Sequence, residues 1–204
     1  MEIFDDRFLA TMEQVVTIHH TIYPQIDPRD IFFESLALRA LHLAGAAGAN
    51  MDQTTANMAG PDLIVGEQRL SIKTETGKGT KPGLITITKL CTTEREPWDA
   101  ETLLERAGAH LLRYERMLML RAIWHEEQIH YQLLEIPLEL LRLLGFVQLE
   151  AVGRRSGIGS LAGDVSVGGE RVFRVHFDAS DRKCSVRGLL VNRCNMLREW
   201  DQRL

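Results

Sequence analysis

One short stretch of the sequence, PDLIVGEQRLSIKTETG at residues 61–77, holds side chains that could carry out chemistry together. Its pattern predicts two strands joined by a turn, with Asp62 at the start of the first strand and Lys73 on the second. Because side chains alternate between the two faces of a strand, Ser71, Lys73 and Glu75 are expected to share one face. Burying such groups without partners is costly, so they either face solvent or hold a ligand.

Two carboxylates beside an ammonium group suit the Mg²⁺-assisted hydrolysis of a phosphodiester. Mg²⁺ is usually bound by one or two carboxylates together with substrate phosphate, and Asp62 and Glu75 offer such carboxylates. The ion would lower the pKa of a bound water and offset the charge growing on phosphorus, while Lys73 orients or deprotonates that water. The alternative is an exposed hairpin in which Lys73 and Glu75 are merely solvated.

The same hairpin contains a recognisable motif. Pro61-Asp62, followed after eight residues by a Ser-Ile-Lys triplet that ends at Lys73, resembles the signature of the PD-(D/E)xK nucleases. In those enzymes the aspartate is a metal ligand and the lysine is catalytic, so the resemblance implies these roles for Asp62 and Lys73. It also implies an αβββα core, which would cover about residues 28–115.

The sequence departs from that signature at Ser71, where most members of the superfamily have a second carboxylate. Some restriction endonucleases share this serine and take the carboxylate from elsewhere, so Ser71 would supply only a hydrogen bond. Glu75, two residues beyond Lys73, is one candidate for the second carboxylate. Glu34 is the other, because many members place an acidic residue on the preceding helix. Strand parity favours Glu75 over Glu34.

Other residues are candidates for contact with DNA. Lys78 and Lys81 lie in the loop GKGTKPG (77–83), where they could reach phosphates beside the site, although a solvated turn is the alternative. The candidates for base recognition lie in the last third of the chain, and they are Arg154, Arg155, Arg174 and His176. Arginine can bind guanine through two hydrogen bonds. The alternatives are a plain surface loop for the first two residues and a solvent-facing strand surface for the others.

The distribution of charge is uneven along the chain. Residues 151–204 contain ten Lys/Arg and six Asp/Glu, a net charge of +4, whereas residues 1–150 contain fourteen and twenty-two, a net charge of −8. An anionic partner is therefore expected to bind the C-terminal part, and residues 146–204 are the expected DNA-recognition elements.

Hydrophobic periodicity and turn residues predict the elements that hold these side chains. Helices are expected at 5–22, from 28 to the Gly/Ala-rich stretch at 44–49, at 99–115 with Asp99 as N-cap, at 137–145 and at 191–202. Strands are expected at 62–65, 69–75, 84–91, 117–124, 129–137, 146–152, 171–178 and 184–190, and a loop at 48–60. The result is an α/β fold: a single domain over residues 1–204, with a mixed sheet flanked by helices and a C-terminal β-rich extension.

Composition excludes several classes of protein. The apolar fraction of 45% and the charged fraction of 25% are those of an ordinary soluble globular protein. The sequence holds no apolar run long enough to cross a membrane, and its acidic, amphipathic start is unlike a secretory signal. Three widely spaced cysteines suggest reduced thiols in a cytoplasmic protein.

With the resemblance, these features predict a Mg²⁺-dependent endonuclease that cuts double-stranded DNA at a defined sequence, as a small type II restriction enzyme does. Because one such site cuts one strand, a homodimer is expected. One alternative is a repair or junction-resolving nuclease with the same core, which recognises the shape of DNA. The other is a non-enzymatic nucleic-acid-binding or regulatory protein whose hairpin charges are incidental.

Overall fold

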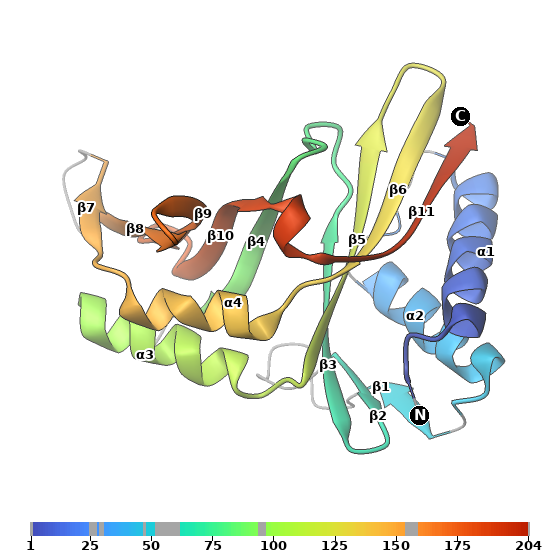
Figure 1. Cartoon of the computed structure of the whole chain (residues 1–204), viewed down its shortest axis with the longest axis horizontal. Helices are drawn as coiled ribbons and strands as arrows, with labels where there is room; N and C mark the ends of the chain where they lie inside the picture. Colours follow the sequence, from blue (N-terminus) through green and yellow to red (C-terminus); the bar gives the residue numbers. More distant parts are fainter. Residues whose placement is uncertain are drawn as a thin grey trace. The chain divides into compact units, whose positions relative to one another are not determined.

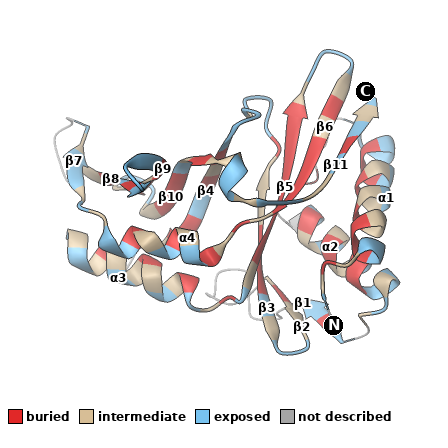
Figure 2. Cartoon of the chain, viewed as in Figure 1, coloured by how far each residue is buried: buried red, intermediate tan, exposed pale blue. Residues whose placement is uncertain are grey.

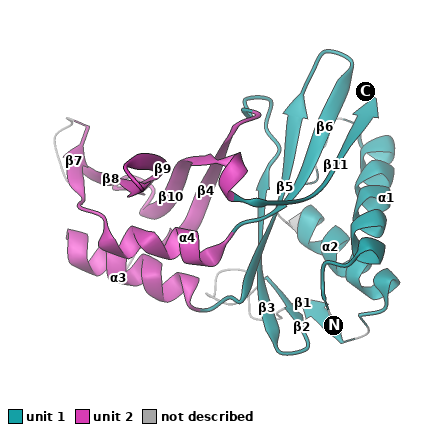
Figure 3. Cartoon of the chain, viewed as in Figure 1, with its two compact units in different colours: residues 1–81, 113–136, 194–204 teal, residues 82–112, 137–193 magenta. Residues whose placement is uncertain are grey.

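The computed structural model of the chain describes residues 2–24, 28, 31–46, 48–51, 62–93, 97–153 and 159–203 (Figure 1). Pro61, Arg154 and Arg155 therefore lie outside the described residues. The chain divides into two compact units (Figure 3). Unit 1 comprises Met1–Lys81, Arg113–Ile136 and Cys194–Leu204, and unit 2 comprises Pro82–Leu112 and Pro137–Arg193.

Two helices form one layer of unit 1. Helix α1 (Asp6–Ile22) begins after Asp5, whose carboxylate accepts a hydrogen bond from the amide of Phe8 at 2.8 Å. This bond satisfies one of the N–H groups that the first turn of a helix leaves unpaired. Helix α2 (Ile31–Ala44) packs against α1, and the apolar stripes of both helices cover one face of a sheet.

The described residues of unit 1 form a six-stranded sheet in the order β1-β2-β3-β5-β6-β11. The strands are β1 (Ala49–Met51), β2 (Leu63–Val65), β3 (Gln68–Glu75), β5 (Arg116–Trp124), β6 (Gln128–Glu135) and β11 (Asn195–Arg203). β3 runs parallel to β5 and all other neighbours are antiparallel, so the sheet is mixed. Gly66, with φ of +60°, opens the two-residue turn between β2 and β3, where a primed hairpin turn favours glycine.

The two faces of this sheet carry different residues. Leu70 and Ile72 of β3 join alternate residues of β5 and β6 in the apolar core beneath α1 and α2. Side chains of the opposite parity, which include Ser71, Lys73 and Arg121, therefore lie on the other face. Figure 2 shows that β5 is buried along nearly its whole length. The apolar core thus fixes which way the polar residues of β3 point.

Unit 2 contains a five-stranded antiparallel sheet in the order β4-β10-β9-β8-β7. Its strands are β4 (Leu84–Thr92), β7 (Glu150–Val152), β8 (Ser160–Val167), β9 (Glu170–Asp178) and β10 (Lys183–Leu190), and its helices are α3 (Ala100–Leu111), α4 (Leu138–Arg142) and the short 3-10 turns η1 (Leu143–Phe146) and η2 (Val191–Arg193). Phe173, Val175 and Phe177 are fully buried on one face of β9. The residues between them face the other way.

Much of the predicted secondary structure is confirmed. The mixed α/β fold, both hairpins and the C-terminal β-rich region are present. Asp99 is the N-cap of α3, because its carboxylate accepts a hydrogen bond from the amide of Thr102 at 2.9 Å.

Four details of the prediction are wrong. No strand is expected over residues 160–167, where the structure has β8. Residues 195–203 form strand β11 rather than a helix, because pairing with β6 overrides the local preference of the segment. The expected loop at 48–60 begins with strand β1, which pairs with β2. The αβββα core would include the strand at 84–91, but this strand is β4, which pairs with β10 in unit 2. In the sheet of unit 1, β3 pairs with β5.

Candidate active site

Asp62 is held at the start of the β2–β3 hairpin by backbone and side-chain contacts. Its amide donates a hydrogen bond to the carbonyl of Leu70 at 3.0 Å, which extends the ladder by one residue. Its Oδ2 accepts hydrogen bonds from the amide of Ile72 at 2.5 Å and from the hydroxyl of Ser71 at 3.3 Å. Ser71 is fully buried, so its hydroxyl holds the carboxylate of Asp62 from the interior of the protein. Both contacts fix the direction in which the carboxylate points.

Lys73 lies beside this carboxylate, as strand parity predicts. Its Nζ is 3.6 Å from Asp62 Oδ2 and donates a hydrogen bond to the carbonyl of Ile72 at 3.0 Å. The side chains of Lys73 and Asp62 are 18% and 25% exposed, so the pair is shielded from bulk water yet open to a ligand. Asp62, Ser71 and Lys73 thus form one cluster on the face opposite the helices.

The oxygen atoms of this cluster suit a hard divalent cation. All side-chain contacts of Asp62 described above fall on Oδ2, and within the described part of the chain its Oδ1 has no hydrogen-bond partner. The carbonyl of Ile72 is a second oxygen next to Lys73. Among the described residues, no group of three or more His, Cys, Asp or Glu side chains could hold a metal ion alone. The Asp62 carboxylate and the carbonyl oxygen of Ile72 fit Mg²⁺, which binds one or two carboxylates and completes its shell with water and substrate phosphate.

Glu75 shares the face of Lys73 but has a strong partner of its own. Its Oε2 is 2.8 Å from Nε of Arg121, which lies beside it across the parallel β3–β5 pairing. The side chain of Arg121 is fully buried and that of Glu75 is 14% exposed. The charge-assisted hydrogen bond from Arg121 fixes the direction of the Glu75 carboxylate.

Arg121 makes two further hydrogen bonds that connect the site to its surroundings. Its Nη1 donates to Oε1 of Gln132 at 2.6 Å, and its Nη2 donates to the carbonyl of Lys81 at 2.5 Å. Gln132 then donates to Glu199 of β11 at 2.9 Å. The buried guanidinium therefore links β3, β5 and β6 with the loop that follows β3.

His130 ends this polar row on β6. Its two ring nitrogens are 2.9 Å from Asp201 and 3.2 Å from Glu199, both on β11. Burial lowers the pKa of His130, but the hydrogen bonds to Asp201 and Glu199 outweigh it, so the pKa is raised above its ordinary value. Both nitrogens can donate to these carboxylates only when the ring is protonated.

The loop with Lys78 and Lys81 is tied to the end of β3. The hydroxyl of Thr80 donates to the carbonyl of Glu75 at 3.1 Å, and the indole of Trp124 donates to the carbonyl of Thr76 at 2.8 Å. The ammonium of Lys78 lies 5.6 Å from the centre of the Trp124 ring. Both lysines are exposed, so the loop offers two cations next to Glu75.

Glu34, the other predicted source of a second carboxylate, lies in the first turn of α2 and is half-buried. The buried residues of this helix pack with Leu70 and Ile72, on the face of β3 opposite Lys73. Strand parity places Glu75 on the same face as Lys73, whereas α2 covers the opposite face of the sheet.

The predicted base-reading residues of the described chain lie in unit 2. Arg174 and His176 project from the outer face of β9, opposite to its buried phenylalanines. Arg174 is paired with Asp164 of β8 at 2.9 Å. Burial lowers the pKa of His176, and the cations Arg187 and Arg174 lower it further, against the opposing effect of Asp178.

Two residues of these surfaces do not follow from the motif or from strand parity within the hairpin. Arg121 is the one charge in the apolar run MLMLRAIW, and a charge in such a run requires a buried partner. Arg187 follows Ser185 on the outer face of β10, next to Arg174. Both are visible in the sequence as charges in strands. Arg121 finds its partner Glu75 46 residues away, whereas Arg187 contacts Ser185 on its own strand and His176 on the neighbouring strand.

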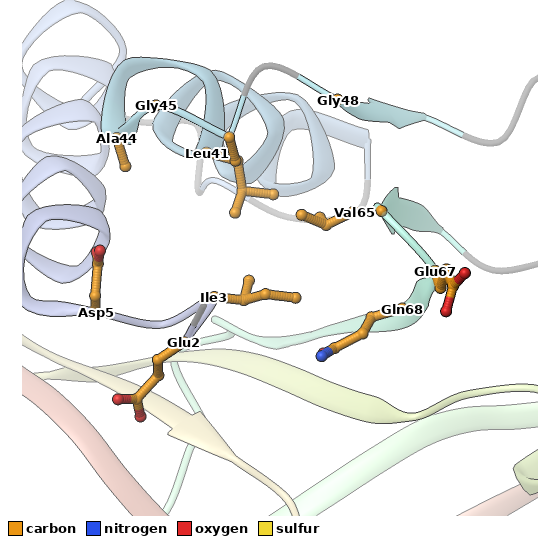
Figure 4. Close-up of a pocket in the computed structure, with 12 residues that line it drawn as sticks. Glu2, Ile3, Asp5, Leu41, Ala44, Gly45, Gly48, Val65, Glu67 and Gln68 are labelled. Carbon is orange, nitrogen blue, oxygen red and sulfur yellow. The ribbon is translucent and has the colours of Figure 1, made fainter.

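Unit 1 also contains a cavity of about 450 Å³ at the other end of the β2–β3 hairpin. Ile3, Leu41 and Val65 converge on its middle, and Glu67 and Gln68 line its rim (Figure 4). Asp62, Ser71 and Lys73 are not among its lining residues, so the cavity is separate from the cluster described above.

Every helix in the described part of the chain is too short or too polar to span a membrane. The described cysteines are free thiols, with Cys91 and Cys184 buried opposite one another on β4 and β10. Burial is the main cause that raises the pKa of the Cys184 thiol, so it is unreactive at neutral pH.

Comparisons with known proteins give the chain a family. The family described as SmaI, type II site-specific deoxyribonuclease, matches residues 1–202. The type II restriction enzyme SmaI from Serratia marcescens is 27% identical over 207 residues, which cover 98% of this chain and 81% of the relative. No solved structure matches the chain. Since the family match spans nearly the whole sequence, the chain belongs to the SmaI family of type II site-specific deoxyribonucleases.

Proposed function

We propose that the chain is a Mg²⁺-dependent restriction enzyme of the PD-(D/E)xK superfamily, with the Ser-x-Lys variant of its motif. The observation that supports this proposal is the cluster of Asp62, Ser71 and Lys73 on one face of a hairpin, in a member of a deoxyribonuclease family. Its substrate is double-stranded DNA, and its reaction is the hydrolysis of one phosphodiester in each strand.

Each residue of the cluster has a role that follows from its contacts. Asp62 would hold the ion through Oδ1, with the carbonyl of Ile72 as a neighbouring donor. A bound Mg²⁺ would polarise water and offset negative charge on the phosphate. Lys73 offers its ammonium to the attacking water and to the phosphate oxygens. Ser71 holds Asp62 in place.

The second carboxylate is assigned to Glu75, in the role of a ligand oriented by Arg121. Glu75 is on the face of Lys73, two residues further along β3, and its ion pair with Arg121 holds the carboxylate in place. Glu34 on α2 is the alternative source.

DNA would be recognised by separate surfaces. Lys78 and Lys81 are exposed beside the catalytic face and are assigned to phosphate contacts, which carry no sequence information. Arg154, Arg155, Arg174 and His176 in the positive C-terminal part are assigned to base recognition. The enzyme would act as a homodimer in the cytoplasm, where the DNA that it cuts is found.

Digestion of a long duplex DNA tests this function. The purified enzyme with Mg²⁺ is expected to give discrete bands with identical end sequences, and EDTA should prevent cleavage. Discrete bands that persist in EDTA would refute the metal requirement. A smear of random ends, or cleavage confined to branched DNA, would refute sequence-specific restriction.

A further inference from the structure

A row of polar side chains crosses the outer face of the unit 2 sheet. The strand register places Arg187 of β10 between Arg174 of β9 and Thr86 of β4, and Asp164 of β8 is opposite Arg174. Arg187 is exposed, whereas Ser185 beneath it on the same face is buried. The row therefore presents its charged groups from strands rather than from loops.

The two central arginines of this row differ in their partners. The carboxylate of Asp164 is 2.9 Å from Nη1 of Arg174 and 3.8 Å from Nη1 of Arg171. Arg187 instead donates from Nε to the hydroxyl of Ser185 at 3.3 Å and from Nη2 to Nδ1 of His176 at 3.1 Å. Both acceptors are neutral, and within the described part of the chain no carboxylate pairs with Arg187. Its positive charge is therefore available to a ligand, whereas that of Arg174 is already offset.

His176 and Ser185 also fix the orientation of the Arg187 guanidinium. Because His176 Nδ1 accepts from Arg187, the ring is neutral and its proton is on Nε2. A guanidinium has five N–H groups, and the two contacts engage the edge formed by Nε and Nη2. Three N–H groups remain, and two of them, one on Nη1 and one on Nη2, form the outer edge. An arginine held in this way loses less conformational entropy on binding than a free one.

We propose that Arg187 reads a guanine of the recognition sequence, through two parallel hydrogen bonds from its outer edge to O6 and N7. This inference rests on the proposed function, since it requires a specific DNA site. It changes the assignment within the sheet, because Arg187 takes the reading role and Arg174 is held by Asp164. The two N–H groups of this edge match O6 and N7, the two acceptors that guanine presents in the major groove. The same edge could bind phosphate, so the test must separate the two partners.

The first step of the test is to map the ends that the wild-type enzyme leaves in a long duplex DNA. Binding to a duplex with that site and to a scrambled duplex is then measured in Ca²⁺, which should suppress cleavage. We expect Arg187→Ala and Arg187→Lys to weaken binding to the mapped site about 10- to 100-fold. Binding of Arg187→Lys to scrambled DNA should stay near wild type, because the charge is retained. Arg171→Ala, an exposed arginine of the same sheet, is the matched control and should keep the specificity ratio.

A modified base identifies the atom that is read. A set of duplexes is prepared in which a different single guanine of the site is replaced by 7-deazaguanine. Each duplex therefore lacks the N7 acceptor at one position. We expect the wild-type enzyme to bind one such duplex weakly, and Arg187→Ala to show no further loss on that duplex.

Several results would overturn the inference. They are a mapped site without guanine, a Lys variant with wild-type affinity for the site, an equal loss of site and scrambled binding in the Ala variant, and a 7-deazaguanine penalty that persists in Arg187→Ala. If the wild-type enzyme leaves no defined ends, the proposed function fails first and the inference fails with it.

Discussion

Arg121 determines the environment in which Glu75 acts. Its side chain is fully buried, and its hydrogen bonds reach Glu75, Gln132 and the carbonyl of Lys81. In the low dielectric of a buried position, each of these bonds is strengthened, and the loss of the arginine would leave a carboxylate without its counter-charge. The residue therefore supports both the stability of unit 1 and the geometry of the candidate site.

The Arg121→Met variant is expected to lose about 3–5 kcal/mol of unfolding free energy, because it removes one member of the buried ion pair with Glu75. Urea denaturation followed by circular dichroism measures this loss. Arg69→Met is the matched control: Arg69 pairs with Glu115 on the surface, where solvent screens the interaction, so its loss should be small. Equal stability of the two variants would mean that the Glu75–Arg121 pair does not stabilise the fold.

The choice between Glu75 and Glu34 can be tested by isosteric replacement. Glu75→Gln keeps an oxygen that can accept from Arg121 but removes the charge that would bind Mg²⁺. We expect Glu75→Gln to need more Mg²⁺ for half-maximal cleavage, while Glu34→Gln behaves as wild type. The measurement is the initial cleavage rate across a Mg²⁺ series. Loss of cleavage in Glu34→Gln, with Glu75→Gln unaffected, would assign the second carboxylate to α2.

β11 is joined to β6 by an ionisable contact in addition to its backbone pairing. His130 on β6 contacts Asp201 and Glu199 on β11, and its pKa is raised from the ordinary 6.5. Because the folded protein binds the His130 proton more tightly than the unfolded chain does, the protonated ring stabilises the fold. This stabilisation is complete below the ordinary pKa of 6.5 and is lost as the pH rises through the pKa of the folded state. The C-terminal strand should therefore be held more tightly at acidic pH.

The difference in unfolding free energy between wild type and His130→Gln is expected to shrink as the pH rises above 6.5, and it can be measured by urea denaturation across a pH series. His176→Gln is an informative comparison, because the pKa of His176 is lowered. Its contribution should be present above pH 6.5 and lost as the pH falls. A pH-independent difference for His130→Gln would contradict the link between β6 and β11.

The β2–β3 hairpin could be predicted from sequence because its strands and turn depend on neighbouring residues. A glycine turn and strict alternation fix the register of β2 and β3, and that register alone brings Asp62 to Lys73. β11 could not be predicted in the same way, because its strand conformation depends on pairing with β6, far away in the sequence. The Glu75–Arg121 pair was missed for the same reason, since it needs the parallel pairing of β3 with β5 across 46 residues.

The two units of the chain hold different candidate functional residues. Unit 1 holds the cluster of Asp62, Ser71 and Lys73, whereas unit 2 holds the sheet with Arg174, His176 and Arg187. Chemistry on the phosphodiester needs only phosphate contacts, so sequence must be read by other residues. We propose that unit 1 cuts DNA and that unit 2 recognises it.

Two copies of the chain are expected to assemble on one DNA site. One proposed catalytic cluster would hydrolyse one phosphodiester, so the simplest way to cut both strands of a palindrome is a pair of chains related by two-fold symmetry. Sedimentation of the protein with a duplex containing the mapped site, in Ca²⁺, should give the mass of two chains and one duplex. A complex with one chain per duplex would contradict this assembly.

The proposed catalytic role of the Asp62–Lys73 pair can be tested most directly by single-turnover cleavage of a duplex that contains the mapped site. With the enzyme in excess and Mg²⁺ saturating for wild type, Asp62→Asn should lose metal-supported cleavage. Lys73→Ala should slow the reaction by about 10²- to 10⁴-fold, the contribution usual for a positioned acid–base group. Both variants should still bind the duplex in Ca²⁺, and Lys89→Ala, which removes an exposed lysine of β4, should cut at the wild-type rate. An Asp62→Asn enzyme that cuts as fast as wild type would contradict the assignment of this pair as the catalytic centre.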